Sequence, residues 1–108
     1  MNIDDSVGLL TAMANAKRLA ILNHLIEREI NVTELAELVG LSQSALSQHL
    51  SKLRAEQLVT TRRNSQTIYY SCKSDAVKAV LQTLDALNNL NRNLAQADSK
   101  EEQIRGAA

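Results

Sequence analysis

The chain has 108 residues, of which 44% are hydrophobic, and its twelve Lys and Arg residues balance its twelve Asp and Glu residues. This length gives one domain with a modest core and excludes a deep cavity together with a catalytic apparatus, while the lack of Trp, Phe and Pro favours a mostly helical fold. The single cysteine, Cys72, excludes an intrachain disulfide, and no secretion signal or long apolar run is present, so we predict a cytoplasmic protein.

A short helix is predicted at the start of the chain. Asp4, Asp5 and Ser6 can cap a helix that runs to about residue 14, with Val7 and Leu10 on one side. A helix of this length is marginal in water when isolated. It must therefore pack on its own domain or on a second subunit.

A second helix is predicted from residue 16 to about residue 29. Asn15 is its cap, and apolar residues recur at core spacing, namely Leu19, Leu22, Leu25 and Ile26. Lys17 and Arg18 lie in its first turn, where cations oppose the helix dipole. Such cations are unfavourable there unless they meet an outside anion, and a phosphate is one candidate.

A helix-turn-helix is predicted over residues 31–55. Asn31-Val-Thr-Glu34 has the form of a capping box, so a helix starts at about Val32. Gly40 occupies the position of a left-handed C-terminal cap, and Ser42 is the cap of the next helix. Two helices joined by about three residues with a glycine in the turn are typical of this motif.

The second helix of this motif has an unusual surface. Leu46, Leu50 and Leu53 fall within one arc at 100° per residue. The opposite side, which we call the Ser/Gln face, carries short, mostly uncharged side chains, which are Ser44, Ser47, Gln48, Ser51 and Lys52. Hydroxyls and amides suit the reading of base edges in a major groove, because they donate and accept hydrogen bonds and do not repel phosphate. The alternative is a helix face that is merely polar.

A hairpin follows the helix-turn-helix. Residues 58–63 and 66–71 alternate like two strands, and turn-forming residues lie between them. The tip carries Arg62 and Arg63 beside Asn64, Ser65 and Gln66. A basic hairpin in this position predicts a winged helix, whose wing can reach the backbone or minor groove of flanking DNA. Alternatively, the two arginines only protect an edge strand from aggregation.

Positive charge is concentrated in this part of the chain. Residues 40–73 contain five cations and one anion, so their net charge is +4 and that of the remaining residues is −4. A localised basic surface is what attraction to phosphate requires, and an acidic remainder limits indiscriminate binding.

A long final helix is predicted from Ser74 or Asp75 to about residue 95. Its apolar residues recur at steps of three and four, as Val77, Val80, Leu81, Leu84, Leu87, Leu90 (or Asn91) and Leu94. This row covers roughly five turns, or about 30 Å, which is longer than the core of so small a domain. Its outer part is therefore expected to pack on a second copy of itself. Residues 1–95 form one domain in this interpretation, and residues 96–108 form a disordered tail.

This order of elements, together with three segments of the sequence, resembles the ArsR/SmtB family of bacterial transcriptional repressors over about residues 4–95. The segments are 12–22, 41–54 and 66–70. The resemblance implies a homodimer with an α-α-α-α-β-β-α winged helix-turn-helix fold that binds a near-palindromic DNA operator. DNA contacts are expected from Gln43, Ser44, Ser47, Gln48, His49 and Lys52 on the helix and from Arg62, Arg63 and Gln66 on the wing. Dimer contacts are expected from Val7, Leu10, Val80, Leu84, Leu87, Leu90 and Leu94.

The sequence departs from metal-sensing and sulfur-sensing members of the family. Asn31 and Thr33 occupy the places of their Cys-x-Cys motif, and Asn23 that of a sensing cysteine in the second helix. The soft ligands are only His24, His49 and Cys72, too few for a tetrahedral site without sharing between subunits. We therefore expect the branch without metal-site cysteines, no cofactor and no identifiable small-molecule ligand, with Cys72 as a packing residue.

The leading hypothesis is a dimeric, sequence-specific DNA-binding repressor. One alternative is a metal- or redox-responsive repressor with a site shared between subunits. Another is a winged-helix module that binds protein, although the Ser/Gln face has no exposed aromatic anchor. An enzyme is disfavoured, because the chain offers no nucleophilic triad, phosphate-binding glycine loop or paired carboxylates.

Overall fold

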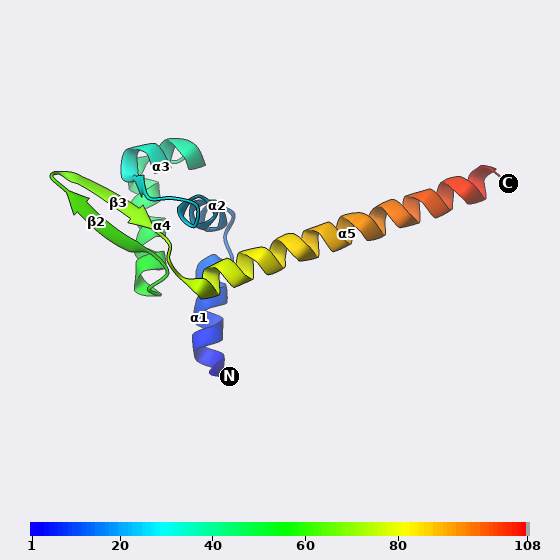
Figure 1. Ribbon diagram of the computed structural model, residues 1–108, viewed down its shortest axis with the longest axis horizontal. Helices are drawn as coiled ribbons and strands as arrows, with labels where there is room; N and C mark the ends of the chain where they lie inside the picture. The colour runs from blue at the N-terminus through cyan, green and yellow to red at the C-terminus, as the bar shows by residue number, and fades with distance from the viewer. Residues whose placement is uncertain (108) are drawn as a thin grey trace. The chain divides into compact units, whose positions relative to one another are not determined.

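The computed structural model describes the backbone of residues 1–107 and the side chains of residues 1–94. The chain divides into two compact units, Met1–Val77 and Lys78–Ala108. The elements in chain order are α1 (Ile3–Met13), α2 (Ala16–Leu25), β1 (Ile30–Asn31), α3 (Val32–Val39), α4 (Gln43–Ala55), β2 (Thr60–Asn64), β3 (Thr67–Ser71) and α5 (Asp75–Ala107), as Figure 1 shows. The predicted mostly helical winged helix-turn-helix order is confirmed, with one strand added.

The N-terminal unit is built on a core of aliphatic side chains. The largest of those that are fully buried come from α2, β1, α3, α4 and the start of α5, and they are Ile21, Leu22, Leu25, Ile30, Leu35, Leu46, Leu50, Leu53 and Val77. Full burial of such a side chain stabilises the fold by about 1.5–3 kcal/mol. Because α4 contributes its apolar arc to this core, its opposite face is left to solvent.

Local capping signals set most helix boundaries. Asn15 and Asn31 accept backbone N–H groups in the first turns of α2 and α3, and Ser42 does so in α4. Gly40 has φ 67°, the left-handed conformation expected after α3. These four predictions are confirmed.

The start of α1, the end of α2 and one capping contact of α3 differ from the predictions. The N-cap of α1 is Asn2, whose side chain accepts the Asp5 N–H at 3.1 Å, because the helix begins ahead of the predicted acidic cap. The Glu34 carboxylate does not complete the capping box, since it is paired with Arg28. α2 ends at Leu25 rather than near residue 29, and a turn leads from it to β1.

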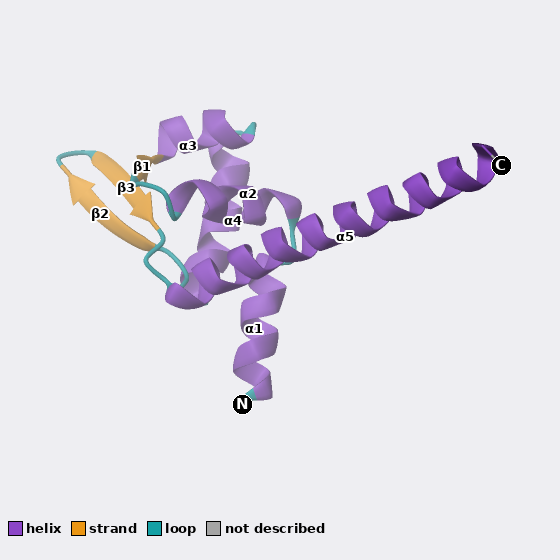
Figure 2. Cartoon of the chain, turned by 45° about the vertical axis from the view of Figure 1, so that its right-hand side comes forward, coloured by secondary structure: helices purple, strands orange, loops and turns teal. Residues whose placement is uncertain are grey.

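The strand β1 was not predicted. It pairs with β3, with Ile30 opposite Tyr70 and Asn31 opposite Tyr69. The sheet order is therefore β1-β3-β2, and the hairpin is joined at its base to the segment that precedes α3, as the cartoon in Figure 2 shows. A strand of two residues leaves no alternating pattern in the sequence, because a pattern needs several residues to be recognised.

The hairpin itself has the predicted form. β2 and β3 pair antiparallel from Thr60 opposite Ser71 to Asn64 opposite Thr67, and the turn is Ser65-Gln66, in which Ser65 has φ 59°. All five residues of β2 are exposed, whereas Tyr70 of β3 is buried. β3 therefore holds the hairpin to the helices, and β2 presents its side chains to solvent.

In the second unit, α5 carries a row of exposed leucines. The first turn of this helix belongs to the N-terminal unit, and there Ser74 Oγ accepts the Val77 N–H at 3.2 Å. Leu84, Leu87, Leu90 and Leu94 are 37–57% exposed, while Val80 is half-buried. The helix, predicted to end near residue 95, continues to Ala107. The side chains of residues 96–108, the predicted disordered tail, lie outside the described part of the structure. Disorder of this tail therefore stays a prediction. No helix in the described part of the chain combines the length and hydropathy needed to cross a membrane.

Candidate nucleic-acid interface

The polar side of α4 that the sequence predicted to be exposed is exposed in the structure. Gln43, Ser44, Ser47, Gln48 and Lys52 are all exposed. The leucines on the other side of the same helix are 0–2% exposed. One rigid helix therefore presents a row of amide and hydroxyl groups to solvent while its opposite side is fixed in the core.

The start of α4 is held by side-chain contacts. Ser42 Oγ accepts the Ala45 N–H at 3.1 Å, and Gln43 Nε2 lies 3.5 Å from Thr33 Oγ1 on α3. The Leu41 N–H donates to the Ala36 carbonyl at 3.0 Å, which closes the turn between the two helices. The angle at which α4 presents its face is thus set by the turn rather than by α4 alone.

The first turn of α4 and the tip of the wing share a hollow. Its volume is about 260 Å³, and both Gln43 and Gln66 contribute to its wall. The other lining residues are Asn31, Val32, Thr33, Thr67 and Ile68. The structure therefore brings together two glutamines predicted from separate parts of the sequence, with polar side chains between them.

The two wing arginines have different environments. Arg62 forms an ion pair with Glu29, with Nη2 at 2.6 Å from Oε1, and its guanidinium carbon lies 4.8 Å from the centre of the Tyr69 ring. The hydrogen bond from Arg62 lowers the pKa of Glu29 below its usual value. Arg63 is exposed, and it has no side-chain hydrogen bond or ion pair with any residue of the described chain. Arg62 thus braces the wing against the segment after α2, and Arg63 extends into solvent.

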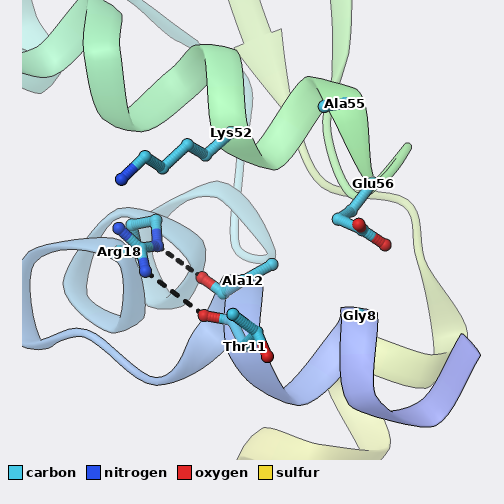
Figure 3. Close-up of a pocket in the computed structure, with 7 residues that line it drawn as sticks. All are labelled: Gly8, Thr11, Ala12, Arg18, Lys52, Ala55 and Glu56. Carbon is cyan, nitrogen blue, oxygen red and sulfur yellow. Dashed lines mark hydrogen bonds between the residues drawn. The ribbon is translucent and has the colours of Figure 1, made fainter. Parts of the chain in front are cut away.

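The cations in the first turn of α2 have partners that the sequence did not reveal. Lys17 Nζ donates to the Val39 carbonyl at 2.7 Å, at the C-terminal end of α3. Arg18, which is 8% exposed, donates from Nε to the Ala12 carbonyl at 2.5 Å and from Nη2 to the Thr11 carbonyl at 3.2 Å (Figure 3). The C-terminal carbonyls of two other helices satisfy these charges, so an outside anion is not needed to explain them.

His49 lies on the flank of α4 that faces α2. It is half-buried, and its Nδ1 is 3.4 Å from Arg18 Nη1. Burial lowers the pKa of His49 below its usual value, and the charges of Arg18, Lys52 and Lys17 lower it further. The neutral form of the His49 imidazole is therefore favoured, and the half-buried ring is set apart from the fully exposed Ser/Gln face.

Arg18 was not among the predicted site residues. Arg18 and Lys52 both lie in the wall of a hollow of about 410 Å³ between α1 and α4. Figure 3 shows the Lys52 side chain extending along α4 toward Arg18. The remaining lining residues are Gly8, Thr11, Ala12, Ala55 and Glu56. The available signal was a cation in the first turn of a helix, but its partners lie on other helices and could not be read from the pattern.

The soft ligands do not form a cluster. Among the described residues, no group of three or more His, Cys, Asp or Glu side chains could hold a metal ion. Cys72 is buried, and its backbone N–H donates to the Leu25 carbonyl at 3.1 Å. His24 is half-buried on α2. These positions offer no preformed metal site within the described part of one subunit.

The sequence and the fold both match known bacterial regulators. Residues 15–61 match the family model described as "Bacterial regulatory protein, arsR family". The nodulation protein NolR of Rhizobium meliloti is 53% identical over 103 residues, which cover 95% of this chain and 82% of NolR. The chain belongs to the arsR family. As a member it is a DNA-binding transcriptional regulator, and the prediction that it is not an enzyme is confirmed.

Other relatives agree with this assignment. The transcriptional activator HlyU of Vibrio cholerae is 49% identical over 86 residues, which cover 80% of each chain. The crystal structure of NolR from Sinorhizobium fredii has a TM-score of 0.77 and 58% identity, and covers 79% of this chain and 85% of that one. The winged helix-turn-helix domain of Mb0332 from Mycobacterium bovis, described as homodimeric, has a TM-score of 0.73 at 26% identity and covers 81% of each chain. These matches place the chain in the NolR and HlyU branch of the family.

Proposed function

We propose that this arsR-family regulator is a homodimeric repressor that acts in the cytoplasm on a near-palindromic operator in double-stranded DNA. Each protomer inserts residues 42–54 into a major groove and places its wing, residues 58–71, on the flanking DNA. The observation that carries this proposal is the exposed Ser/Gln face of α4, on a helix whose other side is fixed in the core. Short polar side chains on a fixed helix can read bases at close range.

The base-reading role belongs to the face of α4. Gln48 lies near the middle of this face, and its amide can donate to and accept from one adenine edge at once. Ser44 and Ser47 are exposed beside it and are short enough to let the helix approach the bases. Gln43 and the wing residue Gln66 share a hollow, so we assign them to neighbouring positions on the DNA.

Backbone contacts are assigned to the cations around this face. Lys52 and Arg63 are exposed and have no carboxylate partner in the described chain. Arg62 shares its charge with Glu29, yet its Nη1 takes no part in that pair and remains for a phosphate. His49 is assigned to the backbone rather than to a base, because it lies on the flank of the helix.

The dimer is assigned to the exposed apolar rows of α1 and α5. On α1, Ile3, Val7 and Leu10 are 54–70% exposed, at steps of four and three residues. On α5, exposed leucines continue for several turns, and we assign them with Val80 to the interface. Large exposed apolar patches on small proteins mark interaction sites. For the two α4 helices of such a dimer to enter consecutive major grooves, they must lie about 34–36 Å apart, one turn of duplex DNA.

The inducing mechanism is proposed to require neither metal nor disulfide. His24, His49 and Cys72 form no ligand group in the described part of one subunit. Elemental analysis of protein purified without an affinity tag would test this directly. A stoichiometric transition metal would favour the alternative with a site shared between subunits.

A binding titration tests the function as a whole. A labelled DNA fragment from upstream of the regulator's own gene is titrated at low salt, with an unrelated fragment of equal length as control, while light scattering reports the mass of the free protein. We expect a dimeric mass and at least a thousandfold preference for the specific fragment. Equal affinity for both fragments, or a monomer at all concentrations, would contradict the proposal.

A further inference from the structure

The contact between Arg18 and His49 fixes the chemistry of the imidazole. Arg18 Nη1 lies 3.4 Å from His49 Nδ1. A guanidinium can donate hydrogen bonds but cannot accept them. Nδ1 must therefore be the acceptor, and a neutral imidazole then carries its proton on Nε2. His49 thus has an Nε2–H donor on the other side of the ring.

Arg18 is well placed to impose this state. It is 8% exposed, and two of its nitrogens already donate to the Ala12 and Thr11 carbonyls at the end of α1. These bonds fix the plane of the guanidinium, so Nη1 approaches His49 from one direction. The orientation of a residue on α4 is in this way tied to α1.

Lys52 adds a positive charge beside His49. It lies three residues after His49 on α4, and residues at this spacing are neighbours on a helix surface. The Lys52 side chain is exposed, and its charge is one of those that lower the pKa of His49. The opposite flank of the helix, at Gln43, contacts α3 instead. His49 and Lys52 therefore form a distinct pair beside the Ser/Gln face.

This pair has no acidic counterpart in the described part of the chain. Lys17 and Arg18 donate to helix carbonyls, and the described ion pairs involve only Arg28 and Arg62. Glu56 lines the same hollow as Arg18 and Lys52, but its carboxylate lies toward Gly8, where an added Cβ would be 2.8 Å from Oε2. A neutral N–H donor beside an ammonium group fits an oxygen of a phosphate diester, which is a charged acceptor.

We propose that Arg18 is a positioning residue that holds His49 in the Nε2–H form, and that His49 and Lys52 together clamp one backbone phosphate of the operator beside the Ser/Gln face of α4. Because the ligand is the operator backbone, this role rests on the proposed function. Arg18 itself does not touch DNA. It determines which nitrogen of His49 carries the proton, and its hydrogen bonds to carbonyls of α1 hold it in place.

The first test uses the protein without DNA. Long-range ¹H–¹⁵N spectra of ¹⁵N-labelled protein near pH 7.5 report which nitrogen of each histidine carries the proton, and His24→Gln assigns the two signals. We expect His49 to be almost entirely the Nε2–H form, and Arg18→Lys and Arg18→Met to produce a mixture of both forms. A dominant Nδ1–H form in the wild type, or an unchanged spectrum in a folded Arg18 variant, would overturn the role of Arg18.

The second test uses DNA and does not depend on any Arg18 variant being folded. In His49→Gln the amide nitrogen stands near the position of Nε2, whereas in His49→Asn the shorter side chain reaches only as far as Nδ1. We expect His49→Gln to keep affinity for the upstream fragment within about threefold, and His49→Asn to lose tenfold or more, in line with a hydrogen bond to a charged group. Lys52→Gln should reduce the salt dependence of binding by about one counterion.

The outcomes separate this inference from the proposed function. If the wild type binds no fragment specifically, the function fails, while the spectra still decide whether Arg18 sets the proton position. If the wild type binds specifically but His49→Gln and His49→Asn are equally affected, the phosphate clamp is wrong and the repressor function stands. His24→Gln should bind DNA like the wild type in either case, because His24 lies outside both proposed contacts.

Discussion

Two rows of leucines in this chain have the same spacing and opposite environments. On α4, Leu46, Leu50 and Leu53 are 0–2% exposed, whereas the row on α5 from Leu84 to Leu94 is 37–57% exposed. Both rows advance by steps of three and four residues, so the sequence pattern alone does not distinguish them. The α4 row is buried within its own subunit, which frees the polar side of that helix for recognition. The α5 row needs a second apolar surface, and this is why we assign it to the dimer.

The largest expected effect comes from truncating one leucine of each row. Leu50→Ala leaves a cavity in the core and should lower the free energy of unfolding by about 2–5 kcal/mol, measured by urea denaturation. Leu90→Ala removes an exposed side chain and leaves the core intact. Its effect should appear in the dissociation constant of the dimer, which we expect to rise roughly tenfold or more by sedimentation or dilution measurements.

Protein concentration provides the control for this pair, because the stability of a dimer depends on it. The Leu50→Ala deficit should persist at every concentration. The Leu90→Ala deficit should shrink as concentration increases. A loss of core stability for Leu90→Ala at high concentration would mean that the two rows do not differ in the way their exposure indicates.

The next effect concerns recognition. Gln48→Ala removes an exposed amide from the polar face without disturbing the leucines behind it, and it should cost about 1–3 kcal/mol of specific binding while relaxing the preference for bases at one position. Binding to a set of single-base operator variants measures this. Ser51→Ala is a matched control, because Ser51 lies on the same exposed side of α4 but is not among the expected DNA contacts. Loss of affinity that is equal for specific and unrelated DNA would argue against base reading by Gln48.

The local parts of this fold could be predicted because their causes are local. Asn15, Asn31 and Ser42 each cap a helix that begins at the next residue, and Gly40 adopts the left-handed conformation its position suggested. A cap involves residues two or three apart, so the sequence pattern contains all of its partners. The polar face of α4 followed from the same kind of reasoning, since helical periodicity assigns each residue to a side.

The contacts that refine the site could not be predicted, because they join distant residues. Arg18 meets His49 across 31 positions, and Arg62 meets Glu29 across 33. Lys17 and Arg18 were recognised as unusual in a first turn, but the sequence could not distinguish a phosphate from the carbonyl ends of α3 and α1 as their partner. Only the packing of the helices decides whether a phosphate or a helix carbonyl is the partner, and this packing depends on the whole N-terminal unit.

A smaller effect distinguishes the two wing arginines. Arg63→Ala should weaken binding to all sequences similarly and lower the slope of log affinity against log salt by about one, because Arg63 lacks a carboxylate partner in the described chain. Arg62→Ala should change that slope less, since Glu29 already shares its charge. Salt titrations with specific and unrelated DNA measure both slopes. Equal changes in the two variants would show that the Glu29 pair opens when DNA binds.

The smallest effect is a dependence of stability on pH through His49. The unfolded chain has an imidazole pKa of about 6.5, and the folded protein has a lower one because of burial and the charges of Arg18, Lys52 and Lys17. Between these values the unfolded state binds more protons, so the free energy of unfolding should fall as the pH decreases through about 6.5 and level off below the folded pKa. Glu29 and Glu34 titrate below their usual value of 4.5, outside this window. Denaturation curves between pH 8 and pH 5 should therefore show a slope of the free energy of unfolding against pH that is lost in His49→Gln and kept in His24→Gln. If this slope is unchanged in His49→Gln, the imidazole is not held against Arg18 in solution.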